Sequence, residues 1–145
     1  MIKFFIFPLS LILLISCKRT PVLREAEKEG LPVDFISFYE KFHQDSAYQM
    51  AHITFPLDGF PSQPDSVTIA QGFHWTADKW VMHKGSMYVD SLFTREFEVP
   101  MPGLVSETIL QKDVPYGIYR RFYRRDDGWY LIFYSDMNRI QKTEK

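Results

Sequence analysis

Apolar residues recur with a helical period in residues 33–45. Four aromatic side chains occupy positions i, i+3, i+4 and i+7 of this stretch: Phe35, Phe38, Tyr39 and Phe42. The spacing places them on one face of an amphipathic helix that packs against a core. Asp34 is the expected N-cap of this helix. Ser46 and Gln49 match a capping box, which predicts that a second short helix begins at Ser46.

The pattern after the helices is that of extended chain and turns. Residues 56–66 contain prolines and an Asp-Gly pair, which predicts a loop. Residues 67–75 are expected to form a strand, and residues 76–79 a turn or short helical turn. Alternation of apolar and polar residues predicts further strands at 80–83, 87–97 and 104–112.

Residues 116–136 give the strongest strand signal. Two runs rich in Tyr, Phe, Ile and Arg flank the segment 126–128, Asp-Asp-Gly. Asp-Gly between β-prone runs predicts a hairpin, and Gly128 is expected at positive φ. A two-residue turn at Asp127-Gly128 pairs Arg125 with Tyr130, whereas a three-residue turn shifts this pairing by one. The sequence leaves both registers open.

The second strand of this hairpin is apolar on both faces, so it is expected to be central in its sheet. Trp129 and Phe133 are expected to face the helix. Two helices followed by strands without intervening helices predict an α+β fold, in which the helices pack on a strongly curved antiparallel sheet. The expected domain spans residues 32–140.

The first seventeen residues read as an export signal. A short positive start precedes the apolar run 4–15, which is too short to span a bilayer comfortably. Residues 14–17, Leu-Ile-Ser-Cys, resemble the bacterial lipobox, which implies cleavage before Cys17 and a lipid on its thiol. The alternative is an ordinary signal peptide. Residues 18–31 are expected to be a flexible tether, and the protein is expected at the membrane of the bacterial cell envelope, in the periplasm or at the cell surface.

Residues 35–57 resemble the opening motif of a family of small exported bacterial proteins, domain of unknown function 4348. The motif is an aromatic helix, then Phe-x-x-Asp-Ser-x-aromatic-Gln, a basic residue, Ile and Phe-Pro-Leu. Residues 75–80 and 128–131 are also similar. The resemblance implies the nuclear transport factor 2-like (cystatin-like) cone, a curved sheet wrapped around helices, and implies no activity. His52 stands where the family commonly has Arg, so a role that needs permanent charge is not expected to transfer.

The composition of the chain excludes several classes of function. The chain has 145 residues, a formal net charge of −1 and a single cysteine. No strongly basic field for nucleic acid exists, and no intrachain disulfide is possible. The four histidines lack the paired spacing of a metal site, so no metal and no cofactor are expected. The arginines of residues 119–125 interleave with aromatic residues, and their stems are expected to cover the rings.

A cone of this kind often contains a pocket, and the candidate lining residues are Tyr39, His43, His52, Trp75, Trp80 and Arg121. The tryptophans either stack on a ligand or fill the space between helix and sheet. Asp45 and His52 share a face only if one helix runs through both. No catalytic residue is identified.

Two functions remain open. The first is a non-catalytic envelope lipoprotein whose domain binds a small ligand or a protein partner. The second is a pocket enzyme of the isomerase or hydratase type that uses a His/Asp pair in the cone. A buried Asp–His pair at the mouth favours the enzyme, and a cone filled by Phe, Trp and Leu excludes it. The aromatic residues of 116–134 also suit a homodimer through the open sheet face.

Overall fold

The computed structural model describes residues 30–85 and 91–140. Cys17, the predicted signal segment and nearly all of the predicted tether lie outside these residues. Leu31 is only 6% exposed and belongs to the core, so the packed part of the chain already includes the last residue assigned to the tether.

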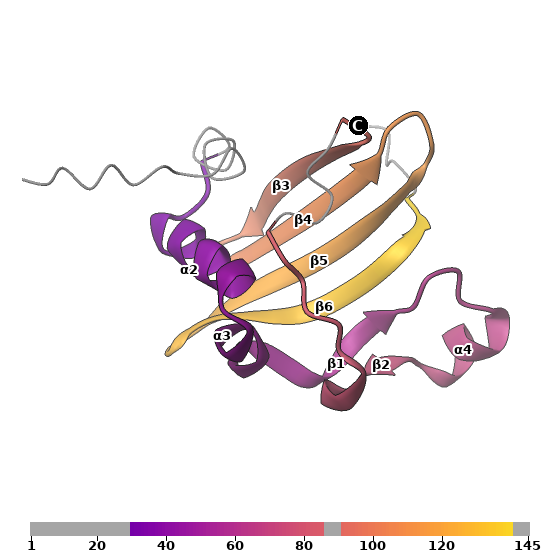
Figure 1. Cartoon of the computed structure of the whole chain (residues 1–145), viewed down its shortest axis with the longest axis horizontal. Helices are drawn as coiled ribbons and strands as arrows, with labels where there is room; N and C mark the ends of the chain where they lie inside the picture. Colours follow the sequence, from indigo (N-terminus) through magenta and orange to yellow (C-terminus); the bar gives the residue numbers. More distant parts are fainter. Residues whose placement is uncertain (1–29, 86–90, 141–145) are drawn as a thin grey trace, which may run out of the picture.

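Six strands form a single curled sheet in the order β2-β1-β6-β5-β4-β3 (Figure 1). The strands are β1 Ile53–Phe60, β2 His74–Trp75, β3 Phe93–Met101, β4 Leu104–Gln111, β5 Tyr116–Arg125 and β6 Gly128–Arg139. Neighbouring strands are antiparallel except β1 and β6, which run parallel. β6 lies between β1 and β5, so the prediction of a central strand is confirmed.

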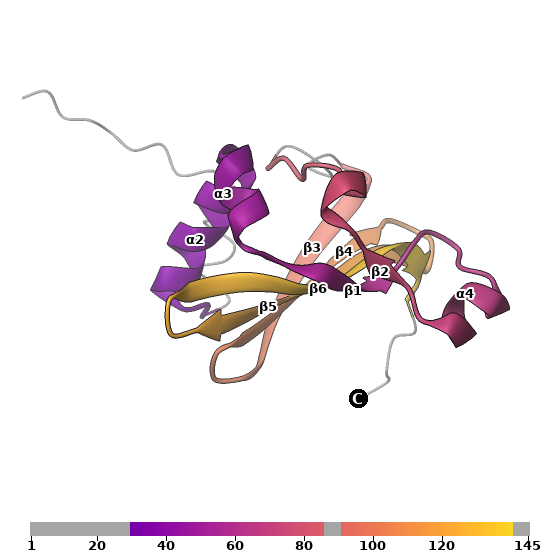
Figure 2. The ribbon, with the colours of Figure 1, turned by 90° about the horizontal axis from the view of Figure 1, so that it is seen from below.

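The helices α2 Val33–Gln44 and α3 Ser46–Ala51 lie together on one face of the sheet (Figure 2). The α4 helix, Ser66–Gln71, projects at the far end of the sheet, and the 3-10 turn η1, Ala77–Lys79, follows β2. The predicted α+β class is therefore confirmed. Within the described part of the chain, no helix has the length and apolar character needed to cross a membrane.

The aromatic stripe of α2 forms the core with the concave face of the sheet. The ring centroid of Phe35 lies 5.4 Å from that of Phe122 on β5 and 5.0 Å from that of Trp129 on β6. Phe38 also contacts Phe122, at 5.9 Å. These edge-to-face contacts are a favourable geometry for aromatic pairs, and they hold the helix over the middle of the sheet.

The predicted caps of both helices are wrong. Pro32 occupies the N-cap position of α2, and Asp34 lies in the first turn. The N-cap of α3 is Asp45, whose side chain accepts a hydrogen bond from the backbone N–H of Tyr48 at 2.9 Å. Ser46 is the first helical residue. Gln49 does not complete a capping box, because its amide is drawn into the core, where it is 1% exposed.

Four of the predicted segments differ from the structure. The strand expected at 87–97 is β3, which begins at Phe93 and continues to Met101, while residues 87–90 lie outside the described residues. The loop expected at 56–66 contains the second half of β1, because a register shift between Ile53 and Asp58 accommodates a proline that has no N–H to donate. The strand expected at 67–75 is mostly α4, which Asp65 caps through the N–H of Thr68. Residues 80–83 form no strand. The helical turn at 76–79 and the strand at 104–112 are confirmed, within a residue or two at each end.

The final hairpin has a two-residue loop, Asp126-Asp127, and Gly128 pairs with Arg125. Neither predicted register is therefore correct. The φ of Gly128 is 147°, positive as predicted. This glycine begins β6 rather than forming the turn.

A bulge at Ile132 reverses the faces of β6. Phe122 is opposite Leu131, whereas the next residue of β5, Arg121, is opposite Phe133. Trp129 and Leu131 therefore face α2, and Phe133 faces outward. The prediction that Phe133 faces the helix is wrong. On the outer face, the guanidinium of Arg121 lies 5.6 Å from the centroid of the Phe133 ring, as expected for arginine stems that cover aromatic rings.

Candidate functional site

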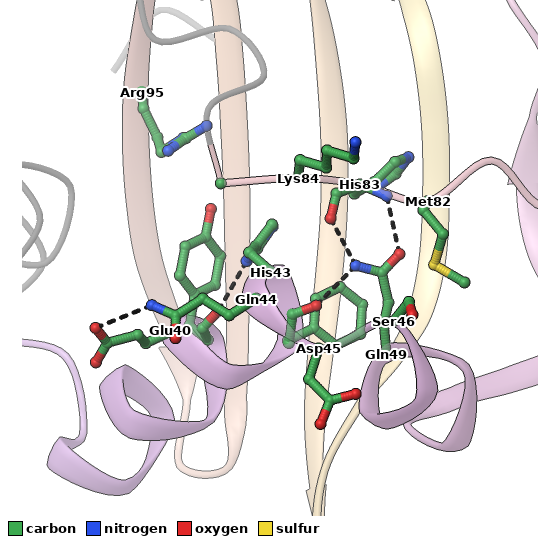
Figure 3. Close-up of a pocket in the computed structure, with 13 residues that line it drawn as sticks. Glu40, His43, Gln44, Asp45, Ser46, Gln49, Met82, His83, Lys84 and Arg95 are labelled. Atoms are coloured by element: carbon green, nitrogen blue, oxygen red, sulfur yellow. Dashed lines mark hydrogen bonds between the residues drawn. The ribbon is translucent and has the colours of Figure 1, made fainter.

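A cavity of about 530 Å³ opens where the end of α2 and the start of α3 face residues 82–85 and β3. The helices contribute Tyr39, Phe42, His43 and polar residues up to Gln49. Met82, His83, Lys84 and Gly85 form the opposite wall with Arg95 (Figure 3). The volume of this cavity and its mixture of apolar and polar lining residues are typical of sites that bind small molecules.

A buried ionic cluster lies beside this cavity. Glu107 on β4 is fully buried, and Arg120 opposite it on β5 is 3% exposed. The Nε atom of Arg120 lies 2.7 Å from Glu107 Oε2, and the Nε atom of Arg95 lies 2.9 Å from Oε1. The Tyr39 hydroxyl donates to the same Oε1 at 2.6 Å. We call Tyr39, Arg95, Glu107 and Arg120 the Glu107 cluster.

Arg120 joins the Glu107 cluster to two histidines. Its Nη1 atom lies 3.1 Å from Nε2 of His43 and 3.2 Å from Nδ1 of His83. A guanidinium only donates, so both ring nitrogens accept and both imidazoles are neutral. His43 then carries its proton on Nδ1, which donates to the carbonyl of Tyr39 at 2.7 Å. His83 carries its proton on Nε2.

Electrostatics agree with these protonation states. Burial, and then the charge of Arg120, lower the pKa of His43 to about 3 and that of His83 to about 2. Burial alone would raise the pKa of Glu107, but Arg120 and Arg95 outweigh it and the pKa is lowered. Burial and the neighbouring Glu107 carboxylate raise the pKa of the Tyr39 phenol. Around neutral pH the carboxylate is charged, the phenol is protonated and the imidazoles are uncharged.

Residues 80–85, which we call the strap, are held across the cavity by Gln49. The Gln49 amide nitrogen donates to the carbonyls of Phe42 and His83, both at 2.7 Å (Figure 3). Its oxygen accepts from the backbone N–H of His83 at 2.9 Å and from the Trp80 indole at 3.2 Å. The buried side chain of Gln49 thus makes the hydrogen bonds that a neighbouring strand would make with the strap. This explains why the strap is ordered without being part of the sheet.

The structure brings together some of the candidates named from the sequence. Tyr39 and His43 line the cavity. Trp80 is buried beside it, where its indole helps to hold the strap. Trp75 packs on Trp80 with a centroid distance of 6.3 Å and donates to the carbonyl of Tyr134, so it fills space behind the cavity.

His52 and Arg121 lie elsewhere. His52 is stacked between Tyr48 and Tyr130, at centroid distances of 3.8 and 5.2 Å, outside the cavity. Arg121 is on the outer face of the sheet, because strand residues alternate between faces and Arg120 takes the inward position. The residue that reaches the histidines is therefore Arg120, not Arg121.

The sequence contains a signal for Glu107 and Arg120, which are not among the candidates named from it. Glu107 stands between Val105 and Ile109, and Arg120 stands between Ile118 and Phe122. In each strand, the flanking pair defines the buried face, so the charged residue between them must also point inward. Two opposite charges in such positions on consecutive strands indicate a buried ion pair.

Among the described residues, neither an acid/base pair nor a metal site stands out. Asp45 lines the cavity but caps α3, and the Asp58–His74 pair is exposed and outside the cavity. Within residues 30–85 and 91–140, no three or more His, Cys, Asp or Glu side chains are placed to hold a metal ion. A cone filled only by Phe, Trp and Leu would exclude an enzyme. The cavity also has polar lining residues, so the enzyme is not excluded on this ground.

Comparison with known proteins defines the fold but not the family. No family model and no curated protein matches the chain, so membership of domain of unknown function 4348 is not confirmed. A crystal structure of a cystatin-like protein from Bacteroides caccae superposes with a TM-score of 0.53 at 19% identity, over 70% of this chain and 74% of that one. The chain thus has the predicted cystatin-like α+β fold.

A second solved structure, a nuclear transport factor 2-like protein from Bacteroides fragilis, is more distant. Its TM-score is 0.42 at 17% identity, over 71% of this chain and 46% of that one. The chain therefore spans less than half the length of that protein.

Proposed function

We propose that this chain is a lipid-anchored binding protein of the bacterial cell envelope, whose domain binds a small molecule in the cavity between α2 and the strap without catalysing a reaction. The observation that carries the proposal is a cavity of about 530 Å³ whose wall is held by the buried Glu107 cluster and by Gln49. A buried polar network that fixes a cavity wall pre-organises a binding site.

The protonation states favour binding over acid–base catalysis. A general base works best when its pKa is near the working pH. The pKa of His43 is lowered to about 3, and both of its ring nitrogens are engaged by protein groups. The His/Asp isomerase or hydratase remains the alternative, and a proton-transfer activity that is lost in His43→Asn would favour it.

A matched pair of substitutions tests the binding function. Native mass spectrometry of the full chain released from its membrane should detect a bound small molecule. Ser46→Trp places an indole into the cavity and should abolish that species. Ser66→Trp, also at the first residue of a short helix but outside the cavity, should retain it. Occupancy that is equal in both variants contradicts a ligand in this cavity.

The anchor rests on Cys17, the single cysteine at the position required by the lipobox. Two or more acyl chains hold a protein stably at a membrane, so the domain itself need not contact lipid. Cells that express the chain should incorporate labelled palmitate into it, and Cys17→Ser should incorporate none and leave the membrane fraction. Palmitate that is retained in Cys17→Ser contradicts this assignment.

We also propose that a second copy of the chain covers the outer face of the sheet. Glu96 and Glu98 on β3 and Arg121 on β5 are exposed there, with Tyr123 45% exposed beside them. A two-fold axis near β4 places acidic β3 of one copy against basic β5 of the other, a self-complementary arrangement. Sedimentation of the detergent-solubilised chain should show a dimer, and Arg121→Glu should yield the monomer. A wild-type monomer at high concentration contradicts it.

A further inference from the structure

We propose that the ligand of this cavity is a small carboxylate with an apolar body, bound with its anionic group towards the strap and β3. This inference rests on the binding function proposed above and names its ligand class. It is carried by the different chemistry of the two sides of the cavity.

The strap side is cationic. Lys84 from the strap and Arg95 from β3 both line the cavity (Figure 3), and Arg120 lies directly behind His83. The single carboxylate of Glu107 offsets only part of this charge, because it lies between the two guanidinium groups of Arg95 and Arg120. An anion on this side therefore meets guanidinium and ammonium donors.

The acidic lining residues are engaged within their own helices. The Glu40 carboxylate accepts from the Gln44 amide at 3.2 Å, and that of Asp45 caps α3 through the N–H of Tyr48. Figure 3 shows both on the helix side of the cavity, away from Lys84. Repulsion between them and an anion near the strap is weakened by distance and solvent.

His83 adds a neutral donor. Arg120 donates to Nδ1 of His83, which fixes the proton on Nε2. No residue in the described ranges accepts a hydrogen bond from this Nε2–H. The proton stays in place at neutral pH, because burial and Arg120 lower the pKa of this imidazole to about 2. A carboxylate oxygen is the acceptor that suits it.

Part of the remaining lining is apolar, beside the polar side chains of Gln44, Ser46 and Gln49. The Phe42 ring is fully buried beneath the cavity, and Met82 is a flexible apolar side chain on the strap. The cavity offers a few cationic donors next to an apolar surface. A ligand with one negative charge and a hydrocarbon or aromatic body is complementary to this arrangement. A cationic group on the strap side would lie next to Lys84 and Arg95.

Three probes with the same phenylpropyl skeleton separate the ligand classes: 3-phenylpropionate, 3-phenylpropanamide and 3-phenylpropylamine. We would titrate each by calorimetry into the full chain in lipid nanodiscs at low salt, with empty nanodiscs as the reference. The carboxylate should bind at least about tenfold more tightly than the amide, since a charge-assisted hydrogen bond contributes about 1.5 kcal/mol or more. The amine should bind most weakly.

Lys84→Gln should weaken the binding of the carboxylate roughly five- to tenfold and leave the affinity for the amide unchanged. Lys84 is exposed, so the variant should fold like the wild type, which a thermal melt checks. The control Lys112→Gln changes an exposed lysine next to β4 and outside this cavity, and should have no effect.

Each result decides the inference. An amide or amine that binds as tightly as the carboxylate overturns the ligand class, and so does a carboxylate that does not bind at about 10 mM. Equal losses in Lys84→Gln and Lys112→Gln assign the effect to overall charge and also overturn it. The binding function is judged separately, by the mass spectrometry of the Ser46→Trp and Ser66→Trp variants.

Discussion

The two ends of the space between α2 and the sheet share the same helix but differ in chemistry. At one end Phe35 and Phe38 pack on Phe122 and Trp129. At the other end Tyr39, one residue after Phe38, enters the Glu107 cluster. Apolar packing at the first end stabilises the fold directly. Buried charges at the second end stabilise it little in net terms, because desolvation opposes their attraction.

This comparison explains where the cavity lies. An apolar end can be filled to crystal-like density by interlocking rings, which leaves no space for a ligand. The charged end is constrained by the directions of its hydrogen bonds, and the strap closes it through Gln49 instead of through a packed strand. The cavity therefore lies at the polar end, where stability is lower and the chemistry is more selective.

Removing the central carboxylate should have the largest effect. Glu107→Leu leaves the buried Arg120 without its carboxylate partner, and the free energy of unfolding should fall by about 3–5 kcal/mol, measured by urea denaturation.

The double variant Glu107→Leu with Arg120→Met replaces the pair by apolar groups and should recover part of this loss. A double variant that is less stable than Glu107→Leu alone would show that the cost of burying an unpaired charge does not govern stability at the polar end.

The bulge at Ile132 predicts unequal effects for two neighbouring apolar residues of β6. Leu131 is fully buried under α2, so Leu131→Ala should lower stability by about 2–5 kcal/mol. Phe133 lies on the outer face, and Phe133→Ala should lower it by about 1 kcal/mol, despite its larger ring. Urea denaturation compares the two, and equal losses would contradict the bulge.

The histidines of the polar end should make stability depend on pH. Each imidazole titrates near pH 6.5 in the unfolded chain but at about 3 or 2 in the folded one, so the unfolded chain binds more protons in between. The contribution of each histidine is complete above pH 6.5 and falls by about 1.4 kcal/mol per unit as the pH drops below it. Denaturation between pH 7 and pH 5 measures this slope.

His83→Asn should remove about half of the slope. A stability that is flat between pH 7 and pH 5 would contradict neutral, buried histidines at the polar end.

The smallest effect concerns the cap that positions the cavity. Asp45→Ala removes the hydrogen bond to Tyr48 at the start of α3 and should lower the free energy of unfolding by about 1 kcal/mol. Ser46→Ala, one residue later, should change it by no more than a few tenths of a kcal/mol. The opposite order in thermal denaturation would restore Ser46 as the cap.

Several elements that depend on neighbouring residues could be predicted from the sequence. The stripe of Phe35, Phe38 and Phe42 follows from the helical period. The Asp-Gly pair predicts the final hairpin and a positive φ at Gly128, although this glycine begins β6 instead of forming the turn. The α+β class follows from the order of the elements. These features are local, so the residues that produce them are close together in the chain.

Tertiary structure alone decided which residues meet at the polar end. Gln49 fits a capping box by sequence, but partners 34 residues away at His83 offer its amide more hydrogen bonds than a helix end does. Phe133 fits the inward parity until the bulge at Ile132 shifts it. The cavity joins α2, α3, the strap and β3, and their placement is set by contacts between segments that are distant in the sequence. Local periodicity identifies the inward-facing charges of Glu107 and Arg120, but only the folded sheet brings them against His43 and His83.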